Sequence, residues 1–297
     1  MRCRSALDPA WLFVGPALAI LALFFVGPVV ASFLLSLTDF DVYAVADLGR
    51  LRVVGLANYR ALLGEPRFWT ALGNTAVFVA VGGPLSIVVS LGAALLLDAR
   101  AVRWKPFFRT VLFLPVVTTL VAVAIVWRAI YHPHAGLLAW LCLRLGVEPI
   151  DWLGDPRWAM PAIILMAVWK NFGFNMLVFL AGLQGVPERL YEAARLDGAG
   201  AWARFRHVTV PVLAPTFGFV AVTTTIGYLQ VFAEPYVMTQ GGPAERTLSV
   251  VLLMYEEGFR WWNLGTAAAI AFVLFALILV VTGAQLGVRR LTGRERA

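Results

Sequence analysis

The chain alternates between long apolar segments and shorter stretches that hold most of its charged residues. Six of the apolar segments reach the roughly 20 residues that an α-helix needs to cross the hydrocarbon core of a bilayer. We expect each of the six to form one transmembrane helix. The predicted spans are residues 11–37, 76–97, 110–130, 159–183, 212–233 and 264–288.

Glycine and proline occur inside these segments, for example at Gly82, Pro84 and Pro115. Packed membrane helices tolerate such residues, whereas membrane strands need an apolar/polar alternation that is missing here. The composition also supports a membrane protein. Of the 297 residues, 61% are hydrophobic and 14% are charged, and such a chain is too apolar for an ordinary soluble domain. The sequence therefore predicts an all-α membrane protein with six transmembrane helices.

Lysine and arginine are concentrated on one side of the predicted membrane, and cytoplasmic loops are enriched in them. With the amino terminus inside, the inner segments hold fourteen basic and six acidic residues, whereas the outer loops hold eight basic and eleven acidic residues. Both termini are predicted to be cytoplasmic. The net charge of +7 then reflects topology and contact with anionic membrane lipid, and we expect no nucleic acid as a partner.

The predicted domain organisation follows from these spans. Residues 1–10 form a cytoplasmic tail, residues 11–288 form the transmembrane domain with a cytoplasmic loop at residues 187–210, and residues 289–297 form a second cytoplasmic tail.

Enzyme motifs are missing from the sequence. The chain has no phosphate-binding P-loop, zinc-protease motif or serine-nucleophile motif, and its two cysteines, Cys3 and Cys142, are far apart. We therefore expect no catalytic residue, metal or cofactor. No acid lies inside a predicted span, although Asp98 and Glu234 lie at span ends. Because a membrane proton relay needs ionisable groups, uphill transport would draw its energy from another polypeptide.

The loop between the fourth and fifth spans carries a helical pattern. Asp197 is expected to end a first short helix and to cap a second, with Gly198 at the corner. Trp202 and Phe205 then fall on one side of the second helix. Pro211 is expected to block helix continuation and to open the fifth span. One interpretation is an amphipathic helix in the lipid headgroups, with its arginines on phosphate.

The same loop resembles the EAA loop of ATP-binding-cassette (ABC) import permeases. Its matching residues are Glu192, Ala193, Ala194, Gly198, Val208, Val210 and Pro211. Other stretches resemble the carbohydrate-uptake permeases of the maltose, lactose and glycerol-phosphate type, namely VGLANYRALLGEPRFWTALGNT, FLPVVTTLVAVAIVWRAIY, YVMTQGGPAERT and YEEGFRWWNLGTAAA. The resemblance covers nearly the whole chain. It departs from the maltose type in lacking extra amino-terminal helices and in its midmembrane residues.

This resemblance implies the ABC type I importer permease fold in a bacterial cytoplasmic (inner) membrane. The implied partners are a second homologous permease subunit in a heterodimer, a cytoplasmic ABC ATPase dimer and an extracytoplasmic solute-binding protein. The implied cargo is a sugar or oligosaccharide. In the family, the EAA loop couples the permease to the ATPase. The implied coupling residues are Glu192, Ala193, Ala194, Asp197, Gly198, Trp202, Phe205 and Pro211.

A sugar inside a membrane needs hydrogen-bond partners and flat apolar surfaces. Polar and aromatic residues cluster near the middle of the fourth span, in AVWKNFGFNM, and of the fifth, in TTTIGYLQVFAE. From their depth and from the resemblance, we predict a substrate pocket formed by Trp169, Lys170, Asn171, Phe174, Thr224, Gly227 and Tyr228.

Three alternatives stay open from the residues. The Asn and Thr side chains can bond neighbouring helices, and Trp and Tyr can belong to an interfacial belt. Lys170 would suit an anionic substrate of the glycerol-phosphate type, although it can also serve a neutral sugar or pair with a carboxylate of the partner permease. The third alternative is a membrane enzyme or a secondary carrier that acts alone.

Overall fold

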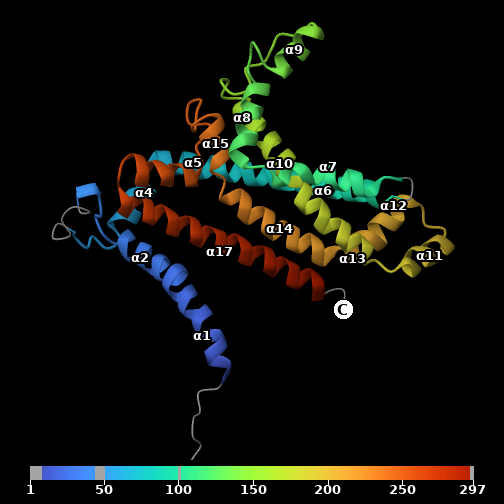
Figure 1. Ribbon diagram of the computed structural model, residues 1–297, viewed down its shortest axis with the longest axis horizontal. Helices are drawn as coiled ribbons and strands as arrows, with labels where there is room; N and C mark the ends of the chain where they lie inside the picture. Colours follow the sequence, from blue (N-terminus) through green and yellow to red (C-terminus); the bar gives the residue numbers. More distant parts are fainter. Residues whose placement is uncertain (1–8, 44–50, 100–101, 295–297) are drawn as a thin grey trace, which may run out of the picture. The chain divides into compact units, whose positions relative to one another are not determined.

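The computed structural model describes residues 9–43, 51–99 and 102–294 (Figure 1). Most of the predicted amino-terminal tail and Cys3 lie outside the described residues. Apart from an isolated bridge between Thr38 and Val53, the described residues form helices, turns and loops, so the predicted all-α class is confirmed. The chain divides into two compact units, Met1–Pro66 with Leu253–Val273 and Arg67–Leu252 with Leu274–Ala297.

The larger unit contains most of the helices, in the order α5 (Pro66–Val77), α6 (Gly83–Asp98), α7 (Lys105–Val117), α8 (Leu120–Ile130), α9 (Leu137–Arg144), α10 (Ala159–Gln184), α11 (Glu188–Leu196), α12 (Ala201–Arg204), α13 (Val210–Val212), α14 (Ala214–Leu229) and α15 (Ala233–Met238). Short π-helical turns join α5 to α6 and α12 to α13.

Helix α10 lies at the centre of this unit and packs against α6, α7 and α14. Two glycines allow the close approach of its neighbours. A Cβ atom on Gly173 would lie 2.5 Å from the backbone oxygen of Leu112 in α7, and one on Gly182 would lie 2.8 Å from the side chains of Leu213 and Thr216. Small residues at such contacts are typical of membrane helices, whose association depends on close van der Waals packing.

Two of the predicted spans are bent pairs of helices in the structure. Helices α7 and α8 meet at 97°, so the prediction of one helix over residues 110–130 is wrong. Thr118 and Thr119 adopt extended backbone conformations between the two helices. The Thr118 hydroxyl donates to the backbone oxygen of Pro115 at 2.6 Å and satisfies a carbonyl that the broken helix leaves without its helical partner.

The second bent pair joins the helical run Ala201–Val212 to α14 at 68°. The structure corrects the predicted role of Pro211, which lies in the last turn before the bend rather than opening the span. Helix α14 begins at Ala214 with Pro215 in its first turn, a position that needs no N–H donor. It ends at Leu229, short of the predicted residue 233, and α15 starts four residues later.

Four continuous helices are long and apolar enough to cross a membrane, namely Phe13–Ser36, Pro66–Asp98, Ala159–Gln184 and Leu264–Val288, and the number rises to six if each bent pair is one span. The second is longer than the predicted 76–97, because its helix already begins at Pro66. Its early turns carry the buried residues Phe68, Ala71 and Thr75, so they pack inside the protein.

The smaller unit contains α1 (Pro9–Leu21), α2 (Gly27–Ser36), α4 (Ala57–Gly64) and the first part of α17 (Leu264–Arg294). Phe33 of α2 contacts Phe272 of α17 edge to face, with ring centroids 5.1 Å apart. The Asn58 amide donates to the backbone oxygens of Ser36 and Thr38 and holds the end of α2. The most apolar window of Phe13–Ser36 has no buried residue, which suits a helix surrounded by lipid.

Candidate functional site

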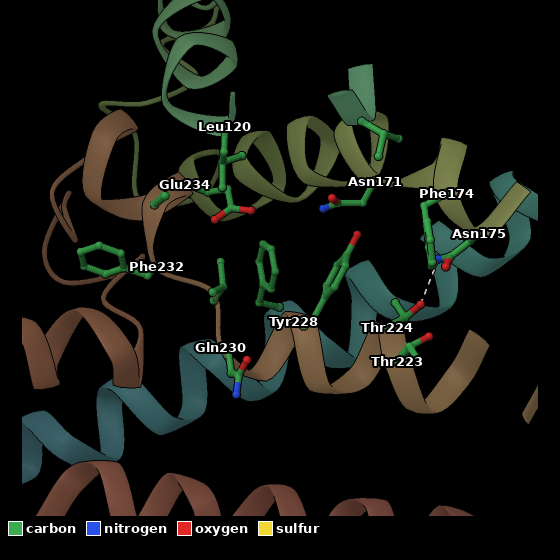
Figure 2. Close-up of a pocket in the computed structure, with 15 residues that line it drawn as sticks. Leu120, Asn171, Phe174, Asn175, Thr223, Thr224, Tyr228, Gln230, Phe232 and Glu234 are labelled. Atoms are coloured by element: carbon green, nitrogen blue, oxygen red, sulfur yellow. Dashed lines mark hydrogen bonds between the residues drawn. The ribbon is translucent and has the colours of Figure 1, made fainter. Parts of the chain in front are cut away.

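The larger unit contains a pocket of about 500 Å³ between α10, α14 and the segment that follows α14 (Figure 2). Five of the seven residues predicted to bind substrate line it, namely Asn171, Phe174, Thr224, Gly227 and Tyr228. The remaining lining residues are Phe78, Val116, Leu120, Asn175, Thr223, Gln230, Val231, Phe232, Ala233 and Glu234. The structure thus brings together residues from the two spans in which the sequence predicted a pocket.

Polar groups converge at one end of this pocket. Figure 2 shows the side chains of Asn171, Tyr228 and Glu234 pointing toward a common space. The Tyr228 hydroxyl is buried and makes no hydrogen bond of good geometry within the described residues, although Ser86 and Asn171 lie close enough to interact with it. A buried hydroxyl gains from a well-aligned hydrogen bond, so a polar group of a ligand at this end of the pocket could complete its bonding.

The position of the Tyr228 ring depends on its neighbours in the second predicted span. Its centroid lies 4.9 Å from that of Phe78. Gly82 faces the ring, and a Cβ atom on Gly82 would lie 2.7 Å from the Tyr228 Cε1 atom. The absence of a side chain at position 82 therefore makes room for the ring.

Thr224 combines two of the roles that the sequence left open. It lines the pocket, and its hydroxyl accepts a hydrogen bond of 2.9 Å from the buried Asn175 amide. This bond joins α14 to α10, as the interhelical interpretation predicts.

Trp169 and Lys170 do not line the pocket. Trp169 packs against Trp127, with ring centroids 5.5 Å apart. Lys170 is buried, and its ammonium group donates to the backbone oxygen of Val116 at 2.9 Å. Lys170 remains near the pocket through this contact, because Val116 is a lining residue, whereas Trp127 is not.

Glu234 is one of the pocket residues that the sequence did not indicate as a site residue, and among the described lining residues it is the charged one. It lies in α15, beyond the end of α14, and only 7% of it is exposed. Burial raises the pKa of its carboxyl group, while a hydrogen bond from its own backbone N–H and the positive charge of Lys170 oppose that shift. The signal available in the sequence was a single acid directly after an apolar span.

The segment predicted to couple to an ATPase forms a helical corner. Helix α11 ends at Leu196 with Asp197 as its C-cap, and Gly198 follows with φ of 77°, a conformation that favours glycine. The expectation that Asp197 caps the second helix is wrong. That helix begins at Ala201, its N-cap is Gly200, and no side chain bonds its first turn.

The corner between α11 and α12 exposes side chains that a partner protein or lipid could contact. Trp202 is 70% exposed and packs against the half-buried Phe205, with ring centroids 5.4 Å apart. Leu196, which is not among the predicted coupling residues, is 90% exposed. Glu192 is also exposed. The exposed surface of this corner therefore combines the apolar side chains of Leu196 and Trp202 with the acidic group of Glu192.

A groove of about 520 Å³ lies beside this surface. Phe205 lines it together with Tyr191 and Arg195, and the ends of α6 and α10 complete it. The Tyr191 and Thr209 hydroxyls lie 3.0 Å apart and fasten α11 to the turn before α13. The corner is therefore tied to the helices that also carry the pocket.

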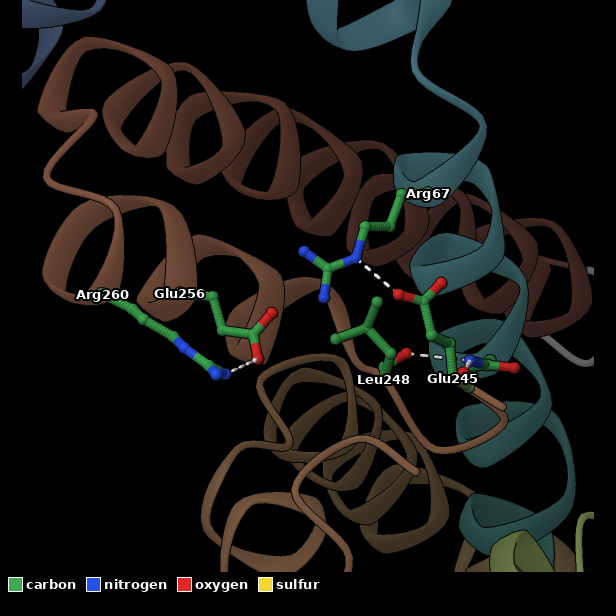
Figure 3. A network of polar contacts seen from close by, with 6 residues as sticks. Arg67, Glu245, Leu248, Glu256 and Arg260 are labelled. Atoms are coloured by element: carbon green, nitrogen blue, oxygen red, sulfur yellow. Dashed lines mark hydrogen bonds and ion pairs between the residues drawn. The ribbon is translucent and has the colours of Figure 1, made fainter. Parts of the chain in front are cut away.

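The loop after α15 is held firmly within the larger unit. Arg67 pairs with the Glu245 carboxylate at 2.6 Å, and the Asn74 amide donates to the backbone oxygens of Glu245 and Leu248 (Figure 3). Gln240 and Glu245 have positive φ angles of 51° and 57°. Such a conformation persists only where surrounding contacts support it.

Relatives of known role match nearly the whole chain. The lactose transport system permease protein LacF of Rhizobium radiobacter is 38% identical over 93% of this chain and 92% of the relative. The trehalose/maltose transport system permease protein MalF of Thermococcus litoralis is 35% identical, with 94% and 93% covered. The arabinooligosaccharides transport system permease protein AraP of Bacillus subtilis is 35% identical, with 92% and 85% covered.

The fold is also found in solved transporters. A chain of a bacterial ABC transporter that imports the acidic polysaccharide alginate superposes with a TM-score of 0.79 and 20% identity, covering 95% of this chain and 99% of that one. Residues 86–292 match the family described as binding-protein-dependent transport system inner membrane component. The chain belongs to this family and is a multi-pass membrane permease of the ABC importer type.

Proposed function

We propose that this chain forms half of the path by which a neutral sugar or oligosaccharide crosses the bacterial cytoplasmic membrane. The observation that carries the proposal is the pocket between α10 and α14, where Asn171 and Tyr228 offer polar groups beside the aromatic rings of Phe78 and Phe174. A sugar presents hydroxyl groups around its edge and C–H groups on its faces, so it needs both kinds of surface. The names of the sugar permeases among the relatives support this substrate class.

The energy for transport is proposed to come through the corner between α11 and α12. An ATPase is implied by the family, and the surface formed by Leu196, Trp202 and Phe205 has the apolar character of an interface anchor. Glu192 supplies a polar group at its edge. The complete transporter is proposed to contain a second homologous permease, a cytoplasmic ATPase dimer and an extracytoplasmic solute-binding protein.

An anionic substrate of the glycerol-phosphate type is the second candidate. One observation favours it: the sn-glycerol-3-phosphate transport system permease protein UgpA of Agrobacterium fabrum is 33% identical over 93% of this chain. Lys170 is the cation that such a substrate would need, but its ammonium group donates to the Val116 backbone oxygen and does not line the pocket. The neutral sugar is therefore the better fit.

The test changes pocket residues and measures two activities of the assembled transporter. Asn171→Ala and Tyr228→Ala should each lower uptake of a transported sugar, identified with lactose, trehalose, maltose and arabinooligosaccharides as probes, while basal ATPase activity persists. Tyr43→Ala is the matched control, because Tyr43 is exposed and lies outside the pocket. Equal loss of assembly, basal ATPase activity and uptake in both pocket variants would instead assign Asn171 and Tyr228 to packing.

A further inference from the structure

Among the described residues that line the pocket, Glu234 has the one formally charged side chain. It is 7% exposed, and its carboxylate points into the space shared with the Asn171 amide and the Tyr228 hydroxyl (Figure 2). Burying a carboxylate costs free energy, so its presence at the edge of this pocket needs a compensating interaction or a ligand.

Lys170, which does not line the pocket, supplies part of the interaction that offsets the cost of burying the carboxylate. It interacts electrostatically with Glu234, and its ammonium group is held by the backbone oxygen of the lining residue Val116. The cation therefore stabilises the carboxylate without presenting its own donors to the pocket. A ligand that enters meets the negative end of this pair.

We propose that Glu234 determines the charge specificity of the pocket: its carboxylate accepts hydrogen bonds from the hydroxyl groups of a neutral, hydroxyl-rich ligand and repels anionic ligands. The inference rests on the proposed function for the identity of the pocket as the transport path. The inference goes beyond the proposed function because it assigns the preference for neutral over anionic ligands to one residue, Glu234.

The chemistry of the three groups supports this rule. A carboxylate has two oxygens and can accept from two neighbouring hydroxyls, which is the arrangement that a sugar offers. The Asn171 amide can both donate and accept, and the Tyr228 hydroxyl can do the same. An anionic ligand would place two like charges in one partly desolvated site, which is strongly unfavourable unless one group takes up a proton.

The test measures the electrostatic potential in the pocket and needs no substrate. Cys3→Ser and Cys142→Ser remove the natural thiols, and Asn171→Cys places a probe thiol beside Glu234. The full chain in membrane vesicles is treated at pH 8 with a cationic and an anionic methanethiosulfonate reagent of similar size. The ratio of the two rates is divided by the same ratio for a small free thiol.

We expect this normalised ratio to favour the cationic reagent by roughly fivefold or more, as one unit charge several ångströms away in a partly hydrated site would produce. Glu234→Gln should bring the ratio close to one. Glu148→Gln is the matched control, because Glu148 is exposed and lies outside the pocket, and it should leave the bias in place. A probe at Phe174, which lies at the other end of the pocket in Figure 2, should show a smaller bias.

Two results would overturn the inference. A ratio that Glu234→Gln leaves unchanged would mean that the carboxyl group does not set the potential, and a ratio that favours the anionic reagent would mean that Lys170 dominates the pocket. Either result can occur while sugar uptake still depends on Asn171 and Tyr228, so failure of this inference is distinct from failure of the proposed function.

Discussion

Tyr228 reaches the pocket because position 82 has no side chain. An alanine Cβ atom at this position would lie 2.7 Å from the Tyr228 Cε1 atom, a separation that real Cβ contacts essentially never show. The ring would have to move, and its hydroxyl would leave the polar end of the pocket. The adjacent Gly83 has no atom within 4 Å of its ideal Cβ position, so the same change there meets open space.

Gly82→Ala should therefore lower sugar uptake severalfold, while Gly83→Ala should leave it near the level of the parent chain. Uptake is measured beside the amount of each variant recovered from the membrane, because a folding defect would reduce both quantities. If Gly82→Ala transports as well as Gly83→Ala, then the position of the Tyr228 ring is not important for transport.

For single residues, the sequence predicted which side chains lie near the middle of the membrane. It did not predict which way each side chain points from its helix. Asn171, Phe174 and Asn175 share one face of α10 because they are three and four positions apart, and all three line the pocket. Trp169 lies at the same depth, but it is roughly 200° around the helix from Asn171 and contacts Trp127 instead. Lys170 lies at the edge of the pocket face, and only the structure shows that its ammonium group binds a backbone oxygen.

The segment at residues 187–210, proposed to couple to the ATPase, exposes large apolar side chains to solvent. Leu196 and Trp202 are 90% and 70% exposed on either side of the Gly198 corner. Truncation of an aromatic interface anchor commonly costs about 2 kcal/mol or more, which is roughly thirtyfold in affinity. Trp202 and Phe205 are the aromatic pair of this surface.

Replacing both rings, Trp202→Ala with Phe205→Ala, should release the ATPase from the membrane complex and abolish transport. Co-purification of the ATPase with the permease is the measurement. Trp140→Ala is the control, because Trp140 is similarly exposed and lies in a loop predicted on the opposite side of the membrane. Retention of the ATPase and of transport in the double variant would exclude this segment as the coupling element and favour a lipid anchor.

The elements themselves were predicted more reliably than their bends. Apolar length alone located the helices of all six segments, because a membrane span must satisfy its backbone within itself. Proline marks a place where a helix can bend but does not set the angle. The 97° bend after α7 occurs where Thr118 and Thr119 adopt extended conformations, which the sequence alone did not indicate.

Coupling to a cytoplasmic ATPase, as proposed, requires that the loop at residues 187–210 lies on the cytoplasmic side of the membrane. The predicted inner segments carry fourteen basic and six acidic residues, against eight and eleven on the predicted outer side. Because cytoplasmic loops retain lysine and arginine, this difference predicts that both termini and the loop at residues 187–210 are inside.

The orientation can be tested with single thiols in the chain without Cys3 and Cys142. A cysteine in the loop at residues 187–210 and a tag after Ala297 should both be protected from membrane-impermeant reagents in intact cells and become reactive after permeabilisation. Glu148→Cys is the positive control, because Glu148 is exposed and lies in a predicted outer loop. Its thiol should react in intact cells, which would show that the reagent reaches the chain. Labelling of the loop or of the carboxyl-terminal tag in intact cells would invert or break the six-span topology. An ATPase could then not reach Trp202 and Phe205, so the proposed coupling mechanism would fail together with the topology.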